Sequence, residues 1–365
     1  MKIAYCTTDL STSNGWGRYS YEILRRLPSY GIEPVILSTN RIHESQGLSF
    51  QPVLSSASGS WTKGFKVLQD WWSNRNLIND CSIVHALTEP VAPASMLLGS
   101  GKKLVLSLHG TYSVTTLHSG WGWLFREAYD KADIIFTVSN YTSSQVLQHL
   151  PHLSAKLFAV PLGVETNHIA ASAIPSADKR EPAFLTVGQV KARKGALEIV
   201  QALGRVVERF PAAHLYIVGD MSDKKYISQV KEKIEELGLQ RSVIWTGRIS
   251  DAELGEYYKK VRGLVMASRN VRSNFEGFGL VHLEANAYGV PAIGSLDCGN
   301  EDAIKDGYSG YLIPQGNIHS LSEAMIKLLC PAEEWDLISN NARRFAEEMS
   351  WDRLVEAYVR RYDGL

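Results

Sequence analysis

The sequence has few cysteines, no excess of charge of either sign and no long apolar run, and each of these shortages excludes a class of protein. Its 4 cysteines are scattered and none forms a C-x-x-C pair, so neither a disulfide framework nor a zinc site is indicated. The formal net charge of +0 provides no overall field that would recruit nucleic acid. No apolar stretch reaches the roughly 18 residues that a membrane-spanning helix needs.

What the sequence does contain is typical of a globular protein with two domains. The chain has 365 residues, of which 45% are hydrophobic and 21% are charged. Met1-Lys2 leads directly into a strand-like run rather than into a signal peptide. We therefore expect a protein of a reducing compartment, the cytoplasm, with no nucleic-acid partner.

The first half alternates strands with helices, as a Rossmann-like domain does. An apolar strand-like run precedes the glycine-rich stretch Asn14–Tyr19, which opens a helix. Gly15 and Gly17 are spaced like the start of a dinucleotide fingerprint, but Ser20 stands where the third glycine would be. The second predicted strand, 34–40, also ends without the acidic residue that holds an NAD ribose, so NAD binding is the weaker alternative.

The second half repeats this alternation after residues 166–182, which lose periodicity and gain Ala, Ser and Pro. We predict a first domain over 1–165, a linker over 166–182, a second Rossmann-like domain over 183–345 and a C-terminal helix over 346–365. Ser350 is the expected N-cap of that helix, whose apolar residues recur at helical spacing.

Residues 274–291 combine two carboxylates with a glycine turn and an apolar helical run. The turn G-F-G lets the backbone approach a ligand, and the first N–H groups of the following helix favour an anion such as phosphate. Glu276 precedes this turn, and we expect Glu284 about five residues into the helix, roughly 8 Å along it. That is the span from a diphosphate to a ribose. The alternative is that both carboxylates only stabilise the helix dipole or face solvent.

Two further features stand next to predicted strand ends. Lys191, Arg193 and Lys194 lie between a strand and a helix start, a position that suits phosphate, although such clusters are more often exposed loops. His109 follows another strand at the carboxyl edge of a parallel sheet, where ligands bind in such folds, although a lone histidine there is often structural.

The stretch E-G-F-G-L-V, the second Glu and A-Y-G-V-P resemble the E-x7-E signature of glycosyltransferase family 4. The segments N-G-W-G-R-Y and V-G-Q-V-K-A-R-K-G are similar to two loops of the same family. The resemblance implies an α/β GT-B fold, with two Rossmann-like domains facing each other across a cleft and a C-terminal helix crossing back to the first. It implies transfer of a hexose, with retention, from a UDP- or GDP-sugar to a saccharide or lipid-linked acceptor. Surface polysaccharide or glycoconjugate biosynthesis is the expected role, without a metal or other cofactor.

The resemblance also implies roles for single residues. Glu276 would hold sugar hydroxyls, Glu284 the ribose, Lys194 the diphosphate, and His109 would line the donor sugar; Glu276, His109 and Lys194 are the expected catalytic residues. The implied diphosphate-binding residues are Lys194, Arg193, Gly15, Phe278, Gly279, Leu280 and Val281. Arg248 and Ile249 would contact the nucleobase, and the acceptor-side candidates are Trp16, Arg18, Tyr19, Trp121 and Trp123.

The chain departs from the family pattern at several positions. Gln189 stands where the family has an arginine on the diphosphate, and we expect Arg193 to supply the missing charge. Asn14 and Cys298 replace glycines that are usual in the family.

Several alternatives stay open at this point. Residues 61–76 mix Trp with Lys and Arg, which is typical either of a helix at the inner membrane surface or of aromatic residues packed onto a core. The tryptophans near residue 121 are likewise candidates for core packing. For the whole chain, the alternative functions are a GT-B sugar-nucleotide epimerase or hydrolase, and a non-catalytic protein that binds sugar nucleotides.

Overall fold

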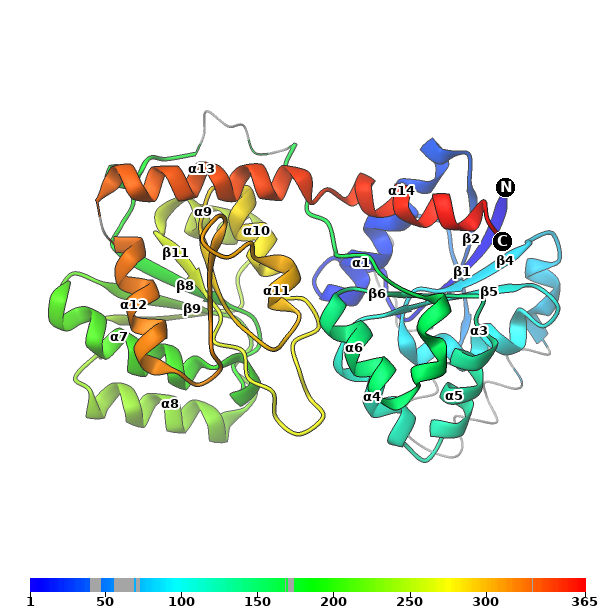
Figure 1. Cartoon of the computed structure of the whole chain (residues 1–365), viewed down its shortest axis with the longest axis horizontal. Coiled ribbons are helices and arrows are strands. Elements are labelled where there is room, and N and C mark those ends of the chain that lie inside the picture. Colours follow the sequence, from blue (N-terminus) through cyan, green and yellow to red (C-terminus); the bar gives the residue numbers. More distant parts are fainter. Residues whose placement is uncertain (40–46, 56–68, 70–72, 168, 170–173, 330) are drawn as a thin grey trace. The chain divides into compact units, whose positions relative to one another are not determined.

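The computed structural model describes residues 1–39, 47–55, 69, 73–167, 169, 174–329 and 331–365 (Figure 1). The chain divides into two compact units, each built around one sheet. Unit 1 consists of Met1–Leu162 and Trp351–Leu365, and unit 2 is Gly163–Ser350. Two Rossmann-like units are therefore present, and the C-terminal helix belongs to the first of them.

Unit 1 contains a 7-stranded parallel sheet in the order β3-β2-β1-β4-β5-β6-β7. The strands are β1 (Lys2–Thr7), β2 (Glu33–Thr39), β3 (Gln51–Leu54), β4 (Ile83–Ala86), β5 (Lys103–Leu108), β6 (Ile134–Thr137) and β7 (Leu157–Ala159). The α-helices described are α1 (Gly15–Leu24), α3 (Ala92–Leu98), α4 (Thr111–Thr115), α5 (Gly122–Lys131), α6 (Asn140–His149) and α14 (Trp351–Tyr362). The short 3-10 helices are η1 (Leu27–Tyr30), η2 (Arg75–Ile78), η3 (Glu89–Val91), η4 (Thr116–His118) and η5 (Pro151–Lys156).

Unit 2 contains a 6-stranded parallel sheet in the order β10-β9-β8-β11-β12-β13. The strands are β8 (Ala183–Val187), β9 (His214–Val218), β10 (Val243–Gly247), β11 (Gly263–Val265), β12 (Ala292–Ser295) and β13 (Gly310–Ile313). The helices are η7 (Ala177–Lys179), η8 (Ala192–Lys194), α7 (Ala196–Arg209), α8 (Lys224–Glu236), α9 (Asp251–Lys260), α10 (Val281–Ala287), α11 (Asn300–Ala303), α12 (Ile318–Leu329) and α13 (Ala332–Glu348).

The cores follow from the sequence pattern of these elements. Parallel strands covered by helices on both faces are buried along much of their length, and every residue of β4, β6 and β12 is buried. On α7 the buried residues Ile199, Val200, Leu203 and Val206 recur at helical spacing and form one stripe against the sheet of unit 2.

The C-terminal helix α14 is tied into unit 1 by a buried chain of polar groups. The hydroxyl of Tyr358 lies 2.7 Å from that of Tyr19, and the hydroxyl of Tyr362 lies 2.6 Å from Nδ1 of His85. Ser107 joins the two pairs, since its Oγ is 2.7 Å from the Tyr19 hydroxyl and 2.8 Å from Nε2 of His85. The prediction that the last helix belongs with the first domain is therefore confirmed.

Part of the predicted linker over 166–182 is built into unit 2. Ala177 is fully buried in the core of that unit. The guanidinium of Arg180 is also buried and donates hydrogen bonds to the carbonyl oxygens of Tyr258 (2.7 Å), Val261 (2.9 Å) and Tyr288 (2.9 Å). Around Ala177 and Arg180, the low periodicity therefore reflects irregular but packed backbone rather than a free connection.

Two predictions concern membranes. Most of residues 61–76 lie outside the described residues, so a surface helix there stays a prediction. Within the described ranges, no helix combines the length and the apolar character that crossing a bilayer requires.

Candidate active site

The basic cluster of unit 2 sits in a tight turn after β8. Arg193 and Lys194 end η8, and Gly195 follows in the left-handed conformation with φ of 73°. A Cβ atom on Gly195 would lie 1.9 Å from the carbonyl oxygen of Ala267, beyond the end of β11. The N–H of Arg269 also donates to the carbonyl of Arg193 at 2.8 Å. Because only glycine allows this close approach, the basic turn packs directly against the end of β11.

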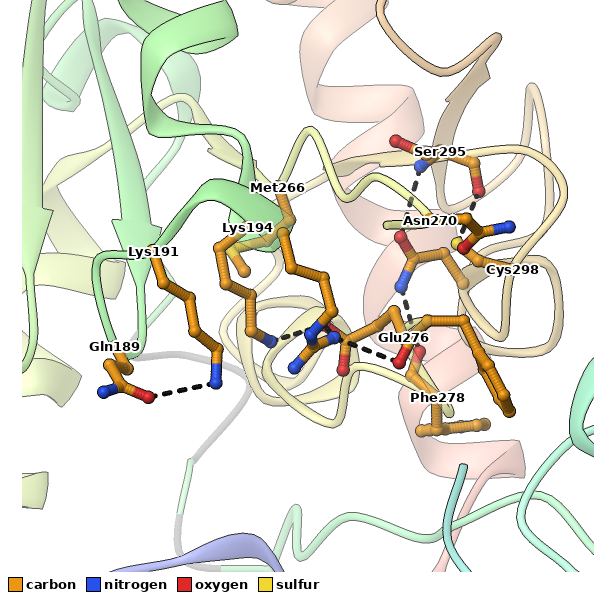
Figure 2. A network of polar contacts seen from close by, with 12 residues as sticks. Gln189, Lys191, Lys194, Met266, Asn270, Glu276, Phe278, Ser295 and Cys298 are labelled. Atoms are coloured by element: carbon orange, nitrogen blue, oxygen red, sulfur yellow. Dashed lines mark hydrogen bonds and ion pairs between the residues drawn. The ribbon is translucent and has the colours of Figure 1, made fainter. Parts of the chain in front are cut away.

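The structure brings Arg193 and Lys194 of this cluster onto Glu276; a shared ligand site for these residues stays a prediction. Oε2 of Glu276 lies 2.5 Å from Nζ of Lys194 and 2.8 Å from a guanidinium nitrogen of Arg193 (Figure 2). The same arginine donates to the carbonyl oxygen of Phe275 at 3.2 Å. Residues more than 80 positions apart in the sequence therefore form one charged group at the carboxyl edge of the sheet.

The balance of burial and charge decides the ionisation of this group. Burial alone would raise the pKa of Glu276, which is only 9% exposed, but the charges of Lys194 and then Arg193 outweigh it and lower the pKa to about 2. Glu276 is therefore an anion at every physiological pH, and it neutralises two half-buried cations that a diphosphate could otherwise engage.

Gln189 and Lys191 complete the basic face. Nζ of Lys191 donates to Oε1 of Gln189 at 3.0 Å (Figure 2). Nε2 of Gln189 donates to Oγ of Ser222 at 3.2 Å. Burial and then the nearby charges of Arg193 and Lys194 lower the pKa of Lys191. Where the family pattern has an arginine, this chain thus places an amide that orients a third lysine.

The turn before α10 explains why its glycines are needed. Gly279 has φ of 87°, and a Cβ there would lie 2.7 Å from Nδ2 of Asn300 and 2.8 Å from Cδ2 of His282. A Cβ on Gly299 would lie 1.9 Å from the carbonyl oxygen of Gly277. Nδ2 of Asn300, at the start of α11, donates to the carbonyl of Phe278 at 3.1 Å. This hydrogen bond holds the backbone of the turn at Phe278 (Figure 2).

Helix α10 begins at Val281, whereas the sequence predicts a helix start near Gly279, two residues earlier. The left-handed backbone of Gly279 is the reason, because it cannot be part of a right-handed helix. Glu284, predicted about five residues into the helix, is the fourth residue of α10, in its first turn, and is half-buried. A ribose role for Glu284 and diphosphate contacts from Phe278 to Val281 stay predictions.

The predicted nucleobase segment follows β10. Arg248 is largely exposed, with one guanidinium nitrogen 3.1 Å from a carboxylate oxygen of Asp220. Ile249 packs beside the core of the sheet face that contains α10. The N–H of Gly219 donates to the carbonyl of Gly247 at 2.8 Å, so the ends of β9 and β10 meet here. Contact of this segment with a nucleobase stays a prediction.

In unit 1, His109 is held from three sides. Its backbone N–H donates to Oε1 of Glu89 at 2.5 Å, and its Nε2 lies 2.8 Å from the carbonyl oxygen of Leu87. The ring of Tyr19 packs edge-on against it, with centroids 4.3 Å apart. A carbonyl only accepts, so Nε2 carries the proton and Nδ1 is an acceptor. Burial lowers the pKa of His109 to about 4, which keeps the imidazole neutral near pH 7.

Glu89 is the group in unit 1 that sequence reasoning missed. Its side chain is fully buried, and within the described part of the chain its Oε2 has no hydrogen-bond partner. Burial raises the pKa of Glu89 to about 7, although the N–H of His109 works in the opposite direction. The signal in the sequence is only its place, three residues after β4, at the same sheet edge as His109.

We expect Glu89→Gln to flatten the dependence of stability on pH. A carboxyl whose pKa is raised by folding, here from 4.5 to about 7, favours the folded state most below pH 4.5 and loses that contribution as the pH rises to 7. Gln does not titrate and can still accept from His109. The variant should therefore gain roughly 3 kcal/mol relative to the wild type between pH 4.5 and 7.5.

Urea unfolding at several pH values measures this difference. Glu127→Gln, an exposed change on α5, is the matched control and should follow the wild type at every pH. A constant offset between Glu89→Gln and the wild type across this pH range would show that Glu89 does not titrate there.

The glycine-rich loop of unit 1 caps α1. Oδ1 of Asn14 accepts from the N–H of Gly17 at 3.0 Å, so this departure from the family glycine supplies an N-cap. Gly15 is the exposed first residue of the helix. Gly17 is the glycine that packing requires, because a Cβ there would lie 2.0 Å from the carbonyl oxygen of Ser11.

The aromatic acceptor-side candidates divide into surface and core. Trp16 is half-buried and packs against Tyr112, which is 52% exposed, with ring centroids 4.9 Å apart. Trp123 is 62% exposed, whereas Trp121 packs against the core. Tyr19 is fully buried, so its prediction as an acceptor contact is wrong.

The remaining candidate in this loop is Arg18, whose Nε donates to the carbonyl of Thr12 at 3.1 Å. Arg18 therefore braces the loop that precedes α1. For metals, the His, Cys, Asp and Glu side chains among the described residues form no group of three or more that could hold an ion.

Two family models match the chain in succession. The model described as Glycosyltransferase Family 4 matches residues 13–168, and the model described as Glycosyl transferases group 1 matches residues 169–345. The first falls almost wholly in unit 1 and the second in unit 2.

Curated relatives are similar over most of their length. The GDP-mannose-dependent alpha-(1-6)-phosphatidylinositol monomannoside mannosyltransferase of Mycolicibacterium smegmatis is 26% identical over 275 residues, which is 70% of this chain and 69% of the relative. The O-antigen chain mannosyltransferase C of Escherichia coli is 29% identical over 238 residues, covering 64% of this chain and 60% of the relative.

Solved structures share the fold at low sequence identity. Anabaena HepE in complex with UDP and glucose has a TM-score of 0.78 at 15% identity, with 100% of both chains covered. A glycosyltransferase from Rickettsia africae has a TM-score of 0.80 at 19% identity, covering 100% of this chain and 98% of the other.

Proposed function

The chain belongs to glycosyltransferase family 4 and has the GT-B fold, and on this premise we propose that it transfers a hexose from a UDP- or GDP-sugar to a saccharide or lipid-linked acceptor with retention of configuration. The observation that carries the proposal is the Glu276–Lys194–Arg193 ion cluster at the carboxyl edge of the second sheet. Surface polysaccharide or glycoconjugate biosynthesis is the proposed role, in line with what the two mannosyltransferase names say of those relatives.

The cluster suits a diphosphate leaving group. The acceptor oxygen bonds to the anomeric carbon while the bond from that carbon to the diphosphate oxygen breaks and its electron pair stays on the diphosphate. Negative charge therefore grows on the leaving group, and fixed cations aimed at it lower the barrier. Lys194 and Arg193 supply these cations. In a retaining reaction by same-face attack, the acceptor proton passes to the leaving phosphate oxygen, so no protein nucleophile is required.

Glu276 changes partners in this proposal. Before the donor binds, its carboxylate holds Lys194 and Arg193 in place. When the diphosphate engages the cations, Glu276 becomes available to accept hydrogen bonds from sugar hydroxyls, with Glu284 on the ribose. Lys194 and Arg193 together carry enough positive charge to neutralise a diphosphate, so we propose that the reaction needs no metal. Contact of neutral His109 with the sugar stays a prediction of the family resemblance.

Product analysis tests the proposal. The protein is incubated with GDP-mannose or UDP-glucose, with and without a saccharide or lipid-linked acceptor, in the presence of EDTA. We expect release of nucleoside diphosphate that depends on the acceptor, and proton NMR should show an α-linked product from the α-linked donor. Release without acceptor would instead identify a hydrolase, and a changed sugar nucleotide would identify an epimerase. Inverted configuration would exclude the retaining mechanism.

A further inference from the structure

His282 is a buried titratable residue for which the proposed reaction has no role. It is the second residue of α10, and its side chain is fully buried. A Cβ on Gly279 would lie 2.8 Å from Cδ2 and 3.1 Å from Nε2 of this histidine. The imidazole therefore lies directly behind the turn that follows Glu276.

Both nitrogens of this ring are unused. Within the part of the chain that the structure describes, neither Nδ1 nor Nε2 of His282 has a hydrogen-bond partner. The neighbouring amide of Asn300 is committed to backbone groups: its Nδ2 donates to the carbonyl of Phe278 at 3.1 Å, and its Oδ1 accepts from the N–H of Ser295 at 3.2 Å. A buried polar group without partners is costly, which indicates that a partner is supplied in another state of the protein.

The ion cluster lies within electrostatic reach of the ring. Burial is the main cause that lowers the pKa of His282 to about 4; the carboxylate of Glu276 raises it and Lys194 lowers it. The imidazole is therefore neutral in the ligand-free protein near pH 7, and its charge state depends on which groups pair with Glu276.

Two other groups beside the cluster are already engaged by neighbours. Arg193 is paired with Glu276. Burial raises the pKa of Cys298 to about 12, and its thiol donates to the carbonyl of Ser295 at 3.2 Å. A proton exchanged at this site near pH 6 therefore belongs either to His282 or to Glu276.

Donor binding changes the surroundings of His282 in one direction. A diphosphate that draws Lys194 and Arg193 away removes positive charge from Glu276, and it brings negative charge of its own. Both changes favour the charged imidazole, because a neighbouring anion stabilises a cation and a departing cation no longer opposes it. The buried carboxylate also loses two donors at that moment, and the adjacent imidazole N–H can replace one of them.

Building on the proposed donor site, we propose that His282 is a positioning residue that becomes the buried partner of Glu276 when a diphosphate engages Lys194 and Arg193. The binding of a sugar nucleotide is thereby coupled to the uptake of a proton by this imidazole. The proton comes from solvent, and no covalent bond other than that N–H forms or breaks. Pairing with the imidazolium would hold the Glu276 carboxylate in place for the sugar hydroxyls.

Isothermal titration calorimetry at pH 5.5 in buffers of different ionisation enthalpy tests this coupling. The probes are GDP-mannose and UDP-glucose, whose phosphates are both esterified and lack the group that titrates near pH 6 in a terminal phosphate. We expect the wild type to take up roughly half a proton or more for each sugar nucleotide bound. His282→Asn should bind with no uptake. His319→Asn, the same change at an exposed histidine on α12, should keep it.

The wild type alone gives a second readout. Since the bound state holds the extra proton, the dissociation constant of the sugar nucleotide should fall as the pH is lowered from 7 to 5, at most about tenfold per pH unit. If His282→Asn does not fold, His282→Leu takes its place in the experiment. It fills the same buried position with an apolar side chain and should abolish this dependence on pH.

Two results would overturn the inference while leaving the donor site intact: binding without proton uptake in the wild type, or uptake that persists in both His282 variants and so belongs to Glu276. If neither sugar nucleotide gives a binding heat, the proposed donor site itself fails, and the inference that rests on it fails with it.

Discussion

Lys194→Ala is expected to lower kcat about 10²- to 10³-fold while the protein still folds. The ammonium of Lys194 lies 2.5 Å from Glu276 in a turn that Gly195 presses against the end of β11, so it is a fixed charge at the proposed diphosphate site. Charge on the leaving diphosphate is larger in the transition state than in the bound donor, so the loss falls mainly on kcat. Initial rates of nucleoside diphosphate release at saturating donor and acceptor measure it.

Lys231→Ala is the matched control, because Lys231 is an exposed residue of α8 in the same unit. It removes the same charge without touching the cluster, and kcat should stay at the wild-type value. If Lys194→Ala also keeps kcat within about twofold, Lys194 does not stabilise the leaving group and the catalytic assignment is wrong.

Glu276→Gln is expected to have effects of opposite sign on catalysis and on product binding. The carboxylate competes with a diphosphate for Lys194 and Arg193, so its removal should strengthen the binding of UDP or GDP by about tenfold. The same change removes the proposed acceptor of sugar hydroxyl protons, so kcat should fall about 10²-fold or more.

Calorimetric dissociation constants for UDP and GDP, set beside kcat, separate these effects. Glu323→Gln, at an exposed position of α12, should change neither. Equal losses of product affinity and of kcat would mean that Glu276 only anchors the basic turn and does not compete with the diphosphate.

The strands and the donor-side motif could be predicted from the sequence because their signals are local. Apolar runs mark buried parallel strands, and the glycines of the G-F-G turn mark the loop that precedes the apolar helix. The ion cluster could be predicted only through the family resemblance. Nothing near Lys194 in the sequence indicates that its partner, Glu276, lies 82 residues further on.

The errors have a common physical cause, which is that burial depends on tertiary packing. The sequence pattern around Tyr19 is the same whether its ring is exposed or buried. In the structure, α1 directs the ring into the core, where it packs against His109. Glu89 and His282 carry no motif, and their significance comes from being fully buried with unused polar atoms. The start of α10 was displaced by the left-handed backbone of Gly279, which sequence periodicity does not reveal.

The measurement that tests the central claim most directly is a thermal-shift series with UDP, GDP, ADP and NAD, on the wild type and on Glu284→Ala. A ligand at about 100 times its dissociation constant adds roughly 2.7 kcal/mol to the stability of the folded protein, which gives a visible rise in Tm. We predict that UDP or GDP stabilises the wild type and that Glu284→Ala reduces this rise. Stabilisation by NAD alone, or by none of the four, would contradict a nucleoside-diphosphate site in unit 2.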